Sequence, residues 1–202
     1  MASRIQAYTG DLRMSARLIP QALVLDSPIN PSPAFLRTVL AGVFNRDVKT
    51  SADPIDNLSE SETVVVLGSK LLLDLGFERN HIQAIFRKFK DVIECWGAQL
   101  RSAIASQGGD KPLKLRPRTL MLTISDNTRA AMVNNHEVHT QYYDFKKDEE
   151  LTALTGVAPI LQLAVNLSQL FESVVDTHRS DWYRLAVKEA AESVCQGERA
   201  VD

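Results

Sequence analysis

The sequence feature that most constrains the fold is a long amphipathic pattern over residues 79–104. Apolar residues recur there at spacings of three and four, as they do on the side of an α-helix that packs against a core. The apolar stripe consists of Ile82, Ile85, Phe86, Phe89, Val92, Ile93, Trp96, Leu100 and Ile104. A chain that carries this stripe needs a long helix, together with other elements that cover its apolar side.

Another helix is predicted immediately before the long one. Ser59 and Glu62 have the spacing of a capping box, in which each side chain bonds the backbone N–H of the other residue. Glu60 and Glu62 also put negative charge in the first turn, where the helix dipole favours it. Gly76 can take a positive φ, so we expect it to end this helix and turn the chain. The stretch from Leu58 to Ile104 is therefore predicted to form two helices joined by a tight turn.

The face of the long helix opposite the stripe carries extended and mostly basic side chains, which we expect in solvent. They are Arg79, Gln83, Arg87, Lys90, Glu94 and Arg101. A basic face at the surface either contacts a polyanion or is only solvated, and the sequence fits both interpretations.

A helix, a turn with a glycine and a second helix with isoleucine soon after the turn resemble the helix-turn-helix of bacterial transcription regulators. Residues 61–89 look most like the motif of MerR-like winged-helix proteins. The matching positions are Leu71, Leu75, Gly76, Phe77, Ile82 and Ile85. The chain departs from the pattern at Leu72, where a small residue is usual, and in the length of the second helix. The two helices then either cross at a different angle or form an ordinary helical hairpin.

The resemblance implies that the first turns of the second helix enter the major groove of duplex DNA. Arg79 would then contact guanine, and Asn80 and Gln83 would contact adenine. The phosphate contacts would come from Arg87, Lys88 and Lys90.

The distribution of charge also favours a polyanion as partner. The chain has a net charge of −2, but residues 79–118 carry nine Lys or Arg against three Asp or Glu. Residues 119–202 carry seven against thirteen. Such asymmetry is typical of a basic contact surface attached to a domain with another role.

The basic residues continue beyond the long helix, over residues 107–118. Gly108, Gly109 and Pro112 are expected to break the helix there. The basic residues of the segment alternate with proline and leucine; they are Lys111, Lys114, Arg116 and Arg118. An extended basic segment fits both a contact with the phosphate backbone and a flexible linker, so both interpretations stay open.

The N-terminal part is predicted to be an arm over residues 1–34. The prolines within residues 28–33 exclude a regular helix or a central strand there. A helix is expected from Ala34 to about Asn45, with Ser32 as its cap and Pro33 at its first position.

After residue 118 the pattern changes to short strands and short helices. The predicted strands cover residues 119–124, 138–145 and 160–165, and the predicted helices cover 148–154, 168–175 and 181–194. An all-helical segment over 159–175 fits nearly as well as a strand followed by a helix. The residues expected to be buried on the last helix are Trp182, Leu185, Ala186, Ala190 and Val194.

The predicted fold class is α+β and mostly helical, with a helix-turn-helix-like N-terminal half and a small C-terminal α/β part. Its segments are an arm (1–34), a helix-turn-helix-like domain (35–106), a basic linker (107–118) and a C-terminal domain (119–202). We expect the C-terminal domain to serve dimerisation or the binding of a protein partner.

No catalytic, metal or cofactor site is predicted. His136 and His139 are three residues apart, whereas zincins place two histidines four apart on one helix. A metal-enzyme hypothesis rests on this pair alone. The acidic residues Asp144, Asp148, Glu149 and Glu150 match no calcium loop. The sequence has neither a phosphate-binding P-loop nor the Gly-x-Ser-x-Gly turn of the α/β-hydrolases.

The cysteine content and the hydropathy predict a soluble cytoplasmic protein. Cys95 and Cys195 are too few and too far apart for a disulfide framework. The N-terminal residues lack the apolar block of a signal peptide. No apolar run approaches the roughly 18 to 20 residues that span a bilayer.

These observations predict a DNA-binding regulatory or accessory protein of a microbe or a phage, acting as a homodimer on double-stranded DNA. The alternative is a protein–protein adaptor, or a subunit of a larger assembly, that does not contact nucleic acid. The alternative rests on the apolar stripe, whose aromatic members Phe86, Phe89 and Trp96 could exceed what one chain can cover.

Overall fold

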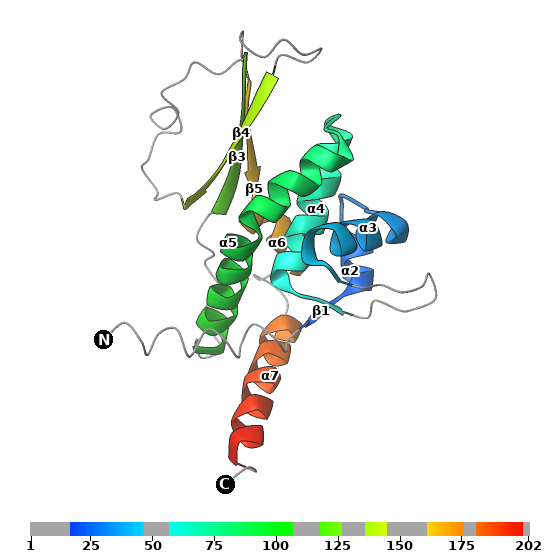
Figure 1. Ribbon diagram of the computed structural model, residues 1–202. Helices are drawn as coiled ribbons and strands as arrows, with labels where there is room; N and C mark the ends of the chain where they lie inside the picture. The colour runs from blue at the N-terminus through cyan, green and yellow to red at the C-terminus, as the bar shows by residue number, and fades with distance from the viewer. Residues whose placement is uncertain are drawn as a thin grey trace, which may run out of the picture. The chain divides into compact units, whose positions relative to one another are not determined.

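The computed structural model describes residues 17–46, 57–106, 118–126, 136–144, 161–175 and 181–199 (Figure 1). The predicted fold class is confirmed, because the protein is α+β and mostly helical, with a few small antiparallel strands. The chain divides into two compact units. One comprises residues 1–114 and 171–202, and the other comprises residues 115–170.

The larger unit is organised around α4 (Glu60–Asp74), which packs against α3 (Pro33–Phe44) and α5 (Arg79–Ser106). Every residue of α4 from Glu60 to Ser69 is buried. Burial on all sides explains how three consecutive valines are accommodated in a helix, since the packing outweighs their weak helix propensity. The burial of α4 ends before its C-cap residue Leu75, which is 54% exposed.

The predicted caps of α3 and α4 and the predicted turn at Gly76 are confirmed. Ser59 and Glu62 form the capping box, in which the Ser59 hydroxyl accepts from the Glu62 N–H at 3.2 Å and the Glu62 carboxylate accepts from the Ser59 N–H at 2.8 Å. The Ser32 hydroxyl caps α3 by accepting from the Phe35 N–H at 3.2 Å. Gly76 has a φ of 91°, in the left-handed region that glycine adopts without strain.

The apolar stripe of α5 is mostly covered by the chain's own elements. Its buried members are Ile82, Ile85, Phe86, Ile93, Trp96, Leu100 and Ile104. Phe89 is half-buried, and Val92, predicted to be buried, is 44% exposed. The stripe therefore serves mainly the core of this unit.

Residues 19–25, which we expected in an irregular arm, form regular structure. β1 (Ile19–Pro20) pairs antiparallel with β2 (Asn57–Leu58), and α2 (Gln21–Leu25) follows directly. Ile19 lies opposite Leu58, and both side chains are wholly buried. Pro20 lies in β1 itself, opposite Asn57, and the prolines of residues 28–33 come only after α2.

The smaller unit is built on an antiparallel sheet with the order β4-β3-β5. The strands are β3 (Arg118–Asp126), β4 (His136–Asp144) and β5 (Leu161–Asn166). In the register of the central strand, Leu120 lies opposite Tyr142 on one side and Val165 on the other. The expected acidic helix over 148–154 lies outside the described residues.

Helix α6 (Leu167–Val175) begins directly after β5. A strand followed by a helix is therefore the correct interpretation of this segment, and the all-helical alternative is wrong. The Asn166 side chain accepts from the Gln169 N–H at 3.1 Å and so caps the helix start. Phe171 and the residues after it belong to the larger unit.

The last helix, α7 (Asp181–Arg199), packs on α5 and extends five residues beyond the predicted end at 194. Leu185, predicted to be buried, is 56% exposed, whereas Tyr183 and Val187 are buried. The buried face of α7 therefore lies about 160° around the helix from Leu185, at 100° per residue. No helix in the described part of the chain is long and apolar enough to cross a membrane.

Candidate nucleic-acid interface

The turn between α4 and α5 is tight and closed by backbone hydrogen bonds. The Phe77 N–H donates to the Leu72 carbonyl and the Gly76 N–H to the Leu73 carbonyl, each at 3.0 Å. Both bonds satisfy carbonyls at the end of α4, as expected when a left-handed glycine terminates a helix. The chain then enters α5, where the Ile82 N–H donates to the Glu78 carbonyl at 3.0 Å.

Arg79 and Asn80 lie in the first turn of α5, and both are exposed. Neither side chain makes a hydrogen bond or an ion pair with another described residue. This turn contains no acidic residue, and the carboxylate of Glu78, which directly precedes it, lies 3.9 Å from the His81 imidazole. Two of the predicted base-contacting side chains are thus available at the surface.

Gln83, the third predicted base-contacting residue, packs against α3 instead. A Cβ added to Gly42 would lie 2.6 Å from the Gln83 amide carbon, so the end of this side chain rests directly on the α3 backbone at Gly42. The Gln83 carbonyl oxygen also accepts from Arg87 Nη2 at 3.2 Å. The geometry favours a role for Gln83 in holding α5 against α3.

Arg87 is exposed, but its guanidinium is engaged with the C-terminal end of α3. Its Nε donates to the Gly42 carbonyl. Gly42 lies in the last turn of α3, which has no basic residue of its own. Because the carbonyls at a helix C-terminus carry partial negative charge, Arg87 stabilises this end of α3.

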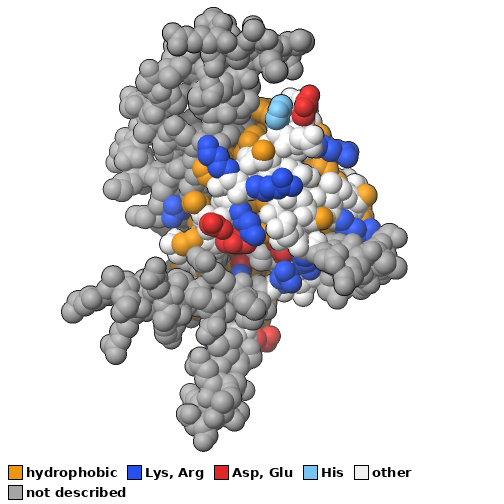
Figure 2. Space-filling view, viewed as in Figure 1, with side chains coloured by type: hydrophobic (Ala, Val, Ile, Leu, Met, Phe, Trp, Pro, Cys, Tyr) orange, Lys and Arg blue, Asp and Glu red, His pale blue; other side chains and the backbone are white. Residues whose placement is uncertain are grey.

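The two predicted phosphate-contacting lysines differ in their surroundings. Lys88 is exposed, with its ammonium 5.6 Å from the centroid of the Phe89 ring. Lys90 is half-buried, with its ammonium 5.7 Å from the Phe44 ring centroid and 3.9 Å from the Glu94 carboxylate. Figure 2 shows Lys and Arg side chains at several places on the visible described surface, with acidic side chains beside some of them, rather than merged into one patch.

The basic segment after α5 contributes one described residue. Arg118 is the first residue of β3, and its N–H donates to the Ser168 hydroxyl at 2.9 Å. Arg118 belongs to the smaller unit. Lys111, Lys114 and Arg116 lie outside the described residues.

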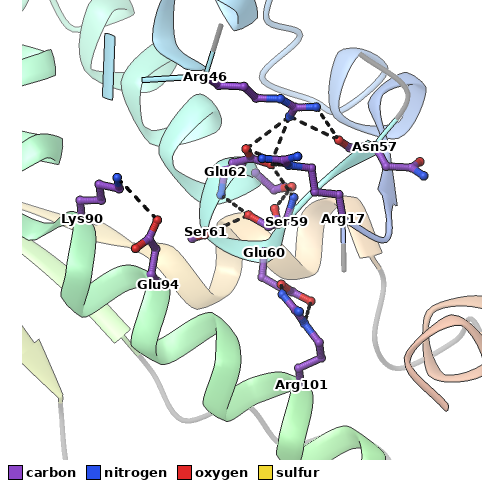
Figure 3. A network of polar contacts seen from close by, with 11 residues as sticks. Arg17, Arg46, Asn57, Ser59, Glu60, Ser61, Glu62, Lys90, Glu94 and Arg101 are labelled. Carbon is purple, nitrogen blue, oxygen red and sulfur yellow. Dashed lines mark hydrogen bonds and ion pairs between the residues drawn. The ribbon is translucent and has the colours of Figure 1, made fainter. Parts of the chain in front are cut away.

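Arg101 was expected on the exposed face of α5, but it is buried. Its guanidinium binds the carboxylate of Glu60 with two hydrogen bonds, of which the one from Nε measures 2.9 Å (Figure 3). The Glu60 carboxylate also accepts from the Tyr183 hydroxyl. This cluster joins the start of α4, the C-terminal half of α5 and the start of α7.

The Glu60 cluster changes the protonation equilibria of its partners. Burial raises the pKa of Tyr183 well above its usual value, and the adjacent Glu60 carboxylate raises it further. Burial alone would lower the pKa of Arg101, but the hydrogen bond and the charge of Glu60 raise it overall. Both shifts keep the protons on Arg101 and Tyr183, so each partner remains a hydrogen-bond donor to Glu60.

Glu62 forms a second polar cluster at the same end of α4. Its carboxylate accepts from Arg17 Nε at 3.2 Å and from Arg46 Nη1 at 3.3 Å (Figure 3). Arg46 also donates to the Asn57 carbonyl at 3.4 Å. Two arginines, from the segments before β1 and after α3, thus converge on one buried carboxylate.

Sequence reasoning missed both clusters. It assigned Glu60 and Glu62 to the favourable helix dipole, which requires no partner side chain. One indication was present: Gly97 and Arg101 are four residues apart, so they lie on one side of α5. A Cβ at Gly97 would lie 3.4 Å from the Glu60 Cβ, so α5 packs close to the start of α4 at this glycine.

Comparisons of the chain with protein-family models, with curated proteins and with solved structures found no match.

Proposed function

We propose that this protein binds double-stranded DNA through the first turns of α5. The observation that carries the proposal is the composition and exposure of residues 75–90. This segment contains four Lys or Arg against one carboxylate, and its first helical turn presents Arg79 and Asn80 to solvent. A helix N-terminus with exposed basic and amide side chains matches what the DNA backbone and the base edges require.

The resemblance to the helix-turn-helix supports the proposal at the same residues. In that motif the residues just after the turn approach the base edges, and in this chain those residues are Arg79 and Asn80. Their exposure favours roles in contacting guanine and adenine. Lys88 suits a phosphate contact because its ammonium has no carboxylate partner among the described residues.

Two other predicted contacts receive a different role in this proposal. Gln83 and Arg87 hold α5 to α3 through Gly42, so they orient the DNA-binding helix.

The basic segment that follows α5 would add phosphate contacts through Lys111, Lys114, Arg116 and Arg118. The protein would act as a homodimer in the cytoplasm of a microbe or a phage-infected cell, as a regulatory or accessory factor.

The protein–protein adaptor has less support. It was inferred from an apolar stripe larger than the chain could cover, and most of that stripe is buried by α3, α4 and α7. Val92 is the stripe's one exposed member among the described side chains, and a single exposed apolar residue is ordinary at a protein surface.

Salt-dependent binding tests the proposal. The anisotropy of a fluorescein-labelled duplex of random sequence is titrated with the full chain at salt concentrations between about 50 and about 200 mM. We expect a complex at low salt whose affinity falls steeply, because each phosphate contact releases a condensed counterion. Lys88→Ala should lower the log–log salt slope by about 1. Absence of any complex at low salt, for this duplex and for genomic fragments, refutes DNA binding.

A further inference from the structure

We infer that α7 detaches from the larger unit as one helix while α3, α4 and α5 stay folded. We call α7 the clasp, because in the closed form it is held to α4 and α5 through Tyr183, Glu60 and Arg101. The inference concerns only the larger unit and does not depend on DNA binding.

The clasp is attached by few buried residues. Among the described side chains of α7, residues 181–192, only Tyr183 and Val187 are buried. In α4, by contrast, every residue from Glu60 to Ser69 is buried. Segments with few buried apolar contacts open at lower free energy than the core that supports them.

The polar part of the attachment is one hydrogen bond to a buried ion pair. The Tyr183 hydroxyl donates to a carboxylate that is fully buried and already bound by Arg101. The ion pair itself adds little net stability, because removing its charges from water costs nearly as much as their attraction returns. The hydrogen bond from Tyr183 is therefore the polar contact that holds α7 in place. When α7 opens, Glu60 keeps Arg101 as its partner, so the open form leaves no unpaired carboxylate.

Both tryptophans of the chain lie at this attachment. Trp96 contacts the Phe171 ring edge-on at a centroid distance of 6.1 Å, and Phe171 in turn contacts Tyr183 at 5.6 Å. Trp182 contacts Tyr183 at 5.6 Å. The chain has two tryptophans, so its intrinsic fluorescence reports on the attachment of α7 without a label.

Native-state hydrogen exchange on the full chain separates opening of the clasp from global unfolding. We expect the amides of α7 to exchange faster than those of α4, with a weaker dependence on denaturant because less surface is exposed. In parallel, the fluorescence of Trp182→Phe, which retains Trp96, should change at lower urea concentration than the helical circular dichroism of the whole chain.

Two substitutions and one control distinguish opening of α7 from unfolding of the whole unit. Val39→Ala, in the buried core of α3, destabilises the closed and the open forms alike. It should therefore speed exchange in α4 about tenfold or more and leave exchange in α7 unchanged. Tyr183→Phe should speed exchange in α7 about ten- to a hundredfold, because it removes a hydrogen bond to a charged acceptor. Leu185→Ala, at an exposed position of the same helix, is the matched control and should change neither.

The inference is overturned if Val39→Ala speeds exchange in α7 as much as in α4. That result would mean that α7 opens only when the whole unit unfolds. Equal exchange free energies for α7 and α4 in the unmodified chain would overturn it too. If Tyr183→Phe prevents folding, the comparison of Val39→Ala with the unmodified chain still decides between the two outcomes.

Discussion

Replacing Arg101 by methionine should destabilise the protein strongly, because it leaves Glu60 buried without its counterion. The side chains of Arg101 and Glu60 are 11% and 1% exposed. Removing one partner of a buried ion pair costs about 3–5 kcal/mol, since the remaining charge is neither solvated nor paired. Most domains are stable by only about 5–15 kcal/mol, so the loss should be large relative to the total.

The double variant Glu60→Met with Arg101→Met should lose less than Arg101→Met alone. It removes both charges and leaves the Tyr183 hydroxyl as the unpaired group, which costs about 1–3 kcal/mol. The free energies of unfolding are measured by urea denaturation at neutral pH, with equal m-values required for comparison. Lys70→Met is the control, because its partner Asp74 is one turn away at the surface and exposed pairs contribute about 0–1 kcal/mol.

Two results would refute this reasoning. One is a loss for Arg101→Met no larger than that of the control. The other is a double variant whose loss equals the sum of the two single losses, because independent sites add whereas a pair in contact does not.

Three further predictions concern single positions. The stability of the protein should fall as the pH rises above about 10, the usual pKa of tyrosine. Above that pH the unfolded chain loses the Tyr183 proton, whereas the folded chain retains it because its pKa is raised. The free energy of unfolding should therefore fall by up to about 1.4 kcal/mol per pH unit. Tyr183→Phe should lack this part of the decline in pH-dependent urea denaturation, and an unchanged decline would argue against the raised pKa. Gly76→Ala should lower the free energy of unfolding by about 1–2 kcal/mol in the same assay, because an alanine at a φ of 91° is strained. No atom lies within 4 Å of the added Cβ, so backbone strain is the whole effect. An unchanged free energy of unfolding would contradict the left-handed turn. Ser59→Ala should cost about 0.5–2 kcal/mol through loss of the capping box, whereas Ser59→Asp, which keeps an acceptor, should cost less.

The features that the sequence predicted correctly are those set by local chemistry. The Ser59–Glu62 capping box and the turn at Gly76 depend on residues only a few positions apart, and each has its expected geometry. The helical period of α5 was also visible, because it extends over many residues. Local rules therefore located α4 and α5 and their boundaries.

The features that the sequence did not predict depend on partners far along the chain. Glu60 and Arg101 are 41 residues apart, and Glu60 and Tyr183 are 123 apart. The periodic pattern placed Arg101 in solvent, and the only nearby indication of a close approach to another element was Gly97, one turn earlier on the same side of α5. Leu185 was assigned to the core because it is apolar, whereas Tyr183 is the buried residue, packed against Phe171 and hydrogen-bonded to Glu60.

In the candidate interface, too, the features set by local sequence were predictable and those set by distant partners were not. The exposure of Arg79 and Asn80 follows from their position just after the turn, which the sequence identified. The engagement of Gln83 and Arg87 with Gly42 could not be foreseen, because it depends on how α3 crosses α5. Periodicity gives the face of a helix but not the element that covers it.

Binding of duplex DNA by the variant Arg79→Ala with Asn80→Ala tests the central claim most directly. Dissociation constants are measured by fluorescence anisotropy at low salt for three proteins: the double variant, the unmodified chain and Lys188→Ala. Lys188→Ala is the control, because it removes an exposed lysine from α7. Each specific base contact contributes about 1–3 kcal/mol to binding, so the double variant should bind DNA at least about tenfold more weakly. Its circular dichroism should be unchanged, and Lys188→Ala should bind DNA with the affinity of the unmodified chain. Equal affinity of all three proteins would contradict DNA binding through the first turn of α5.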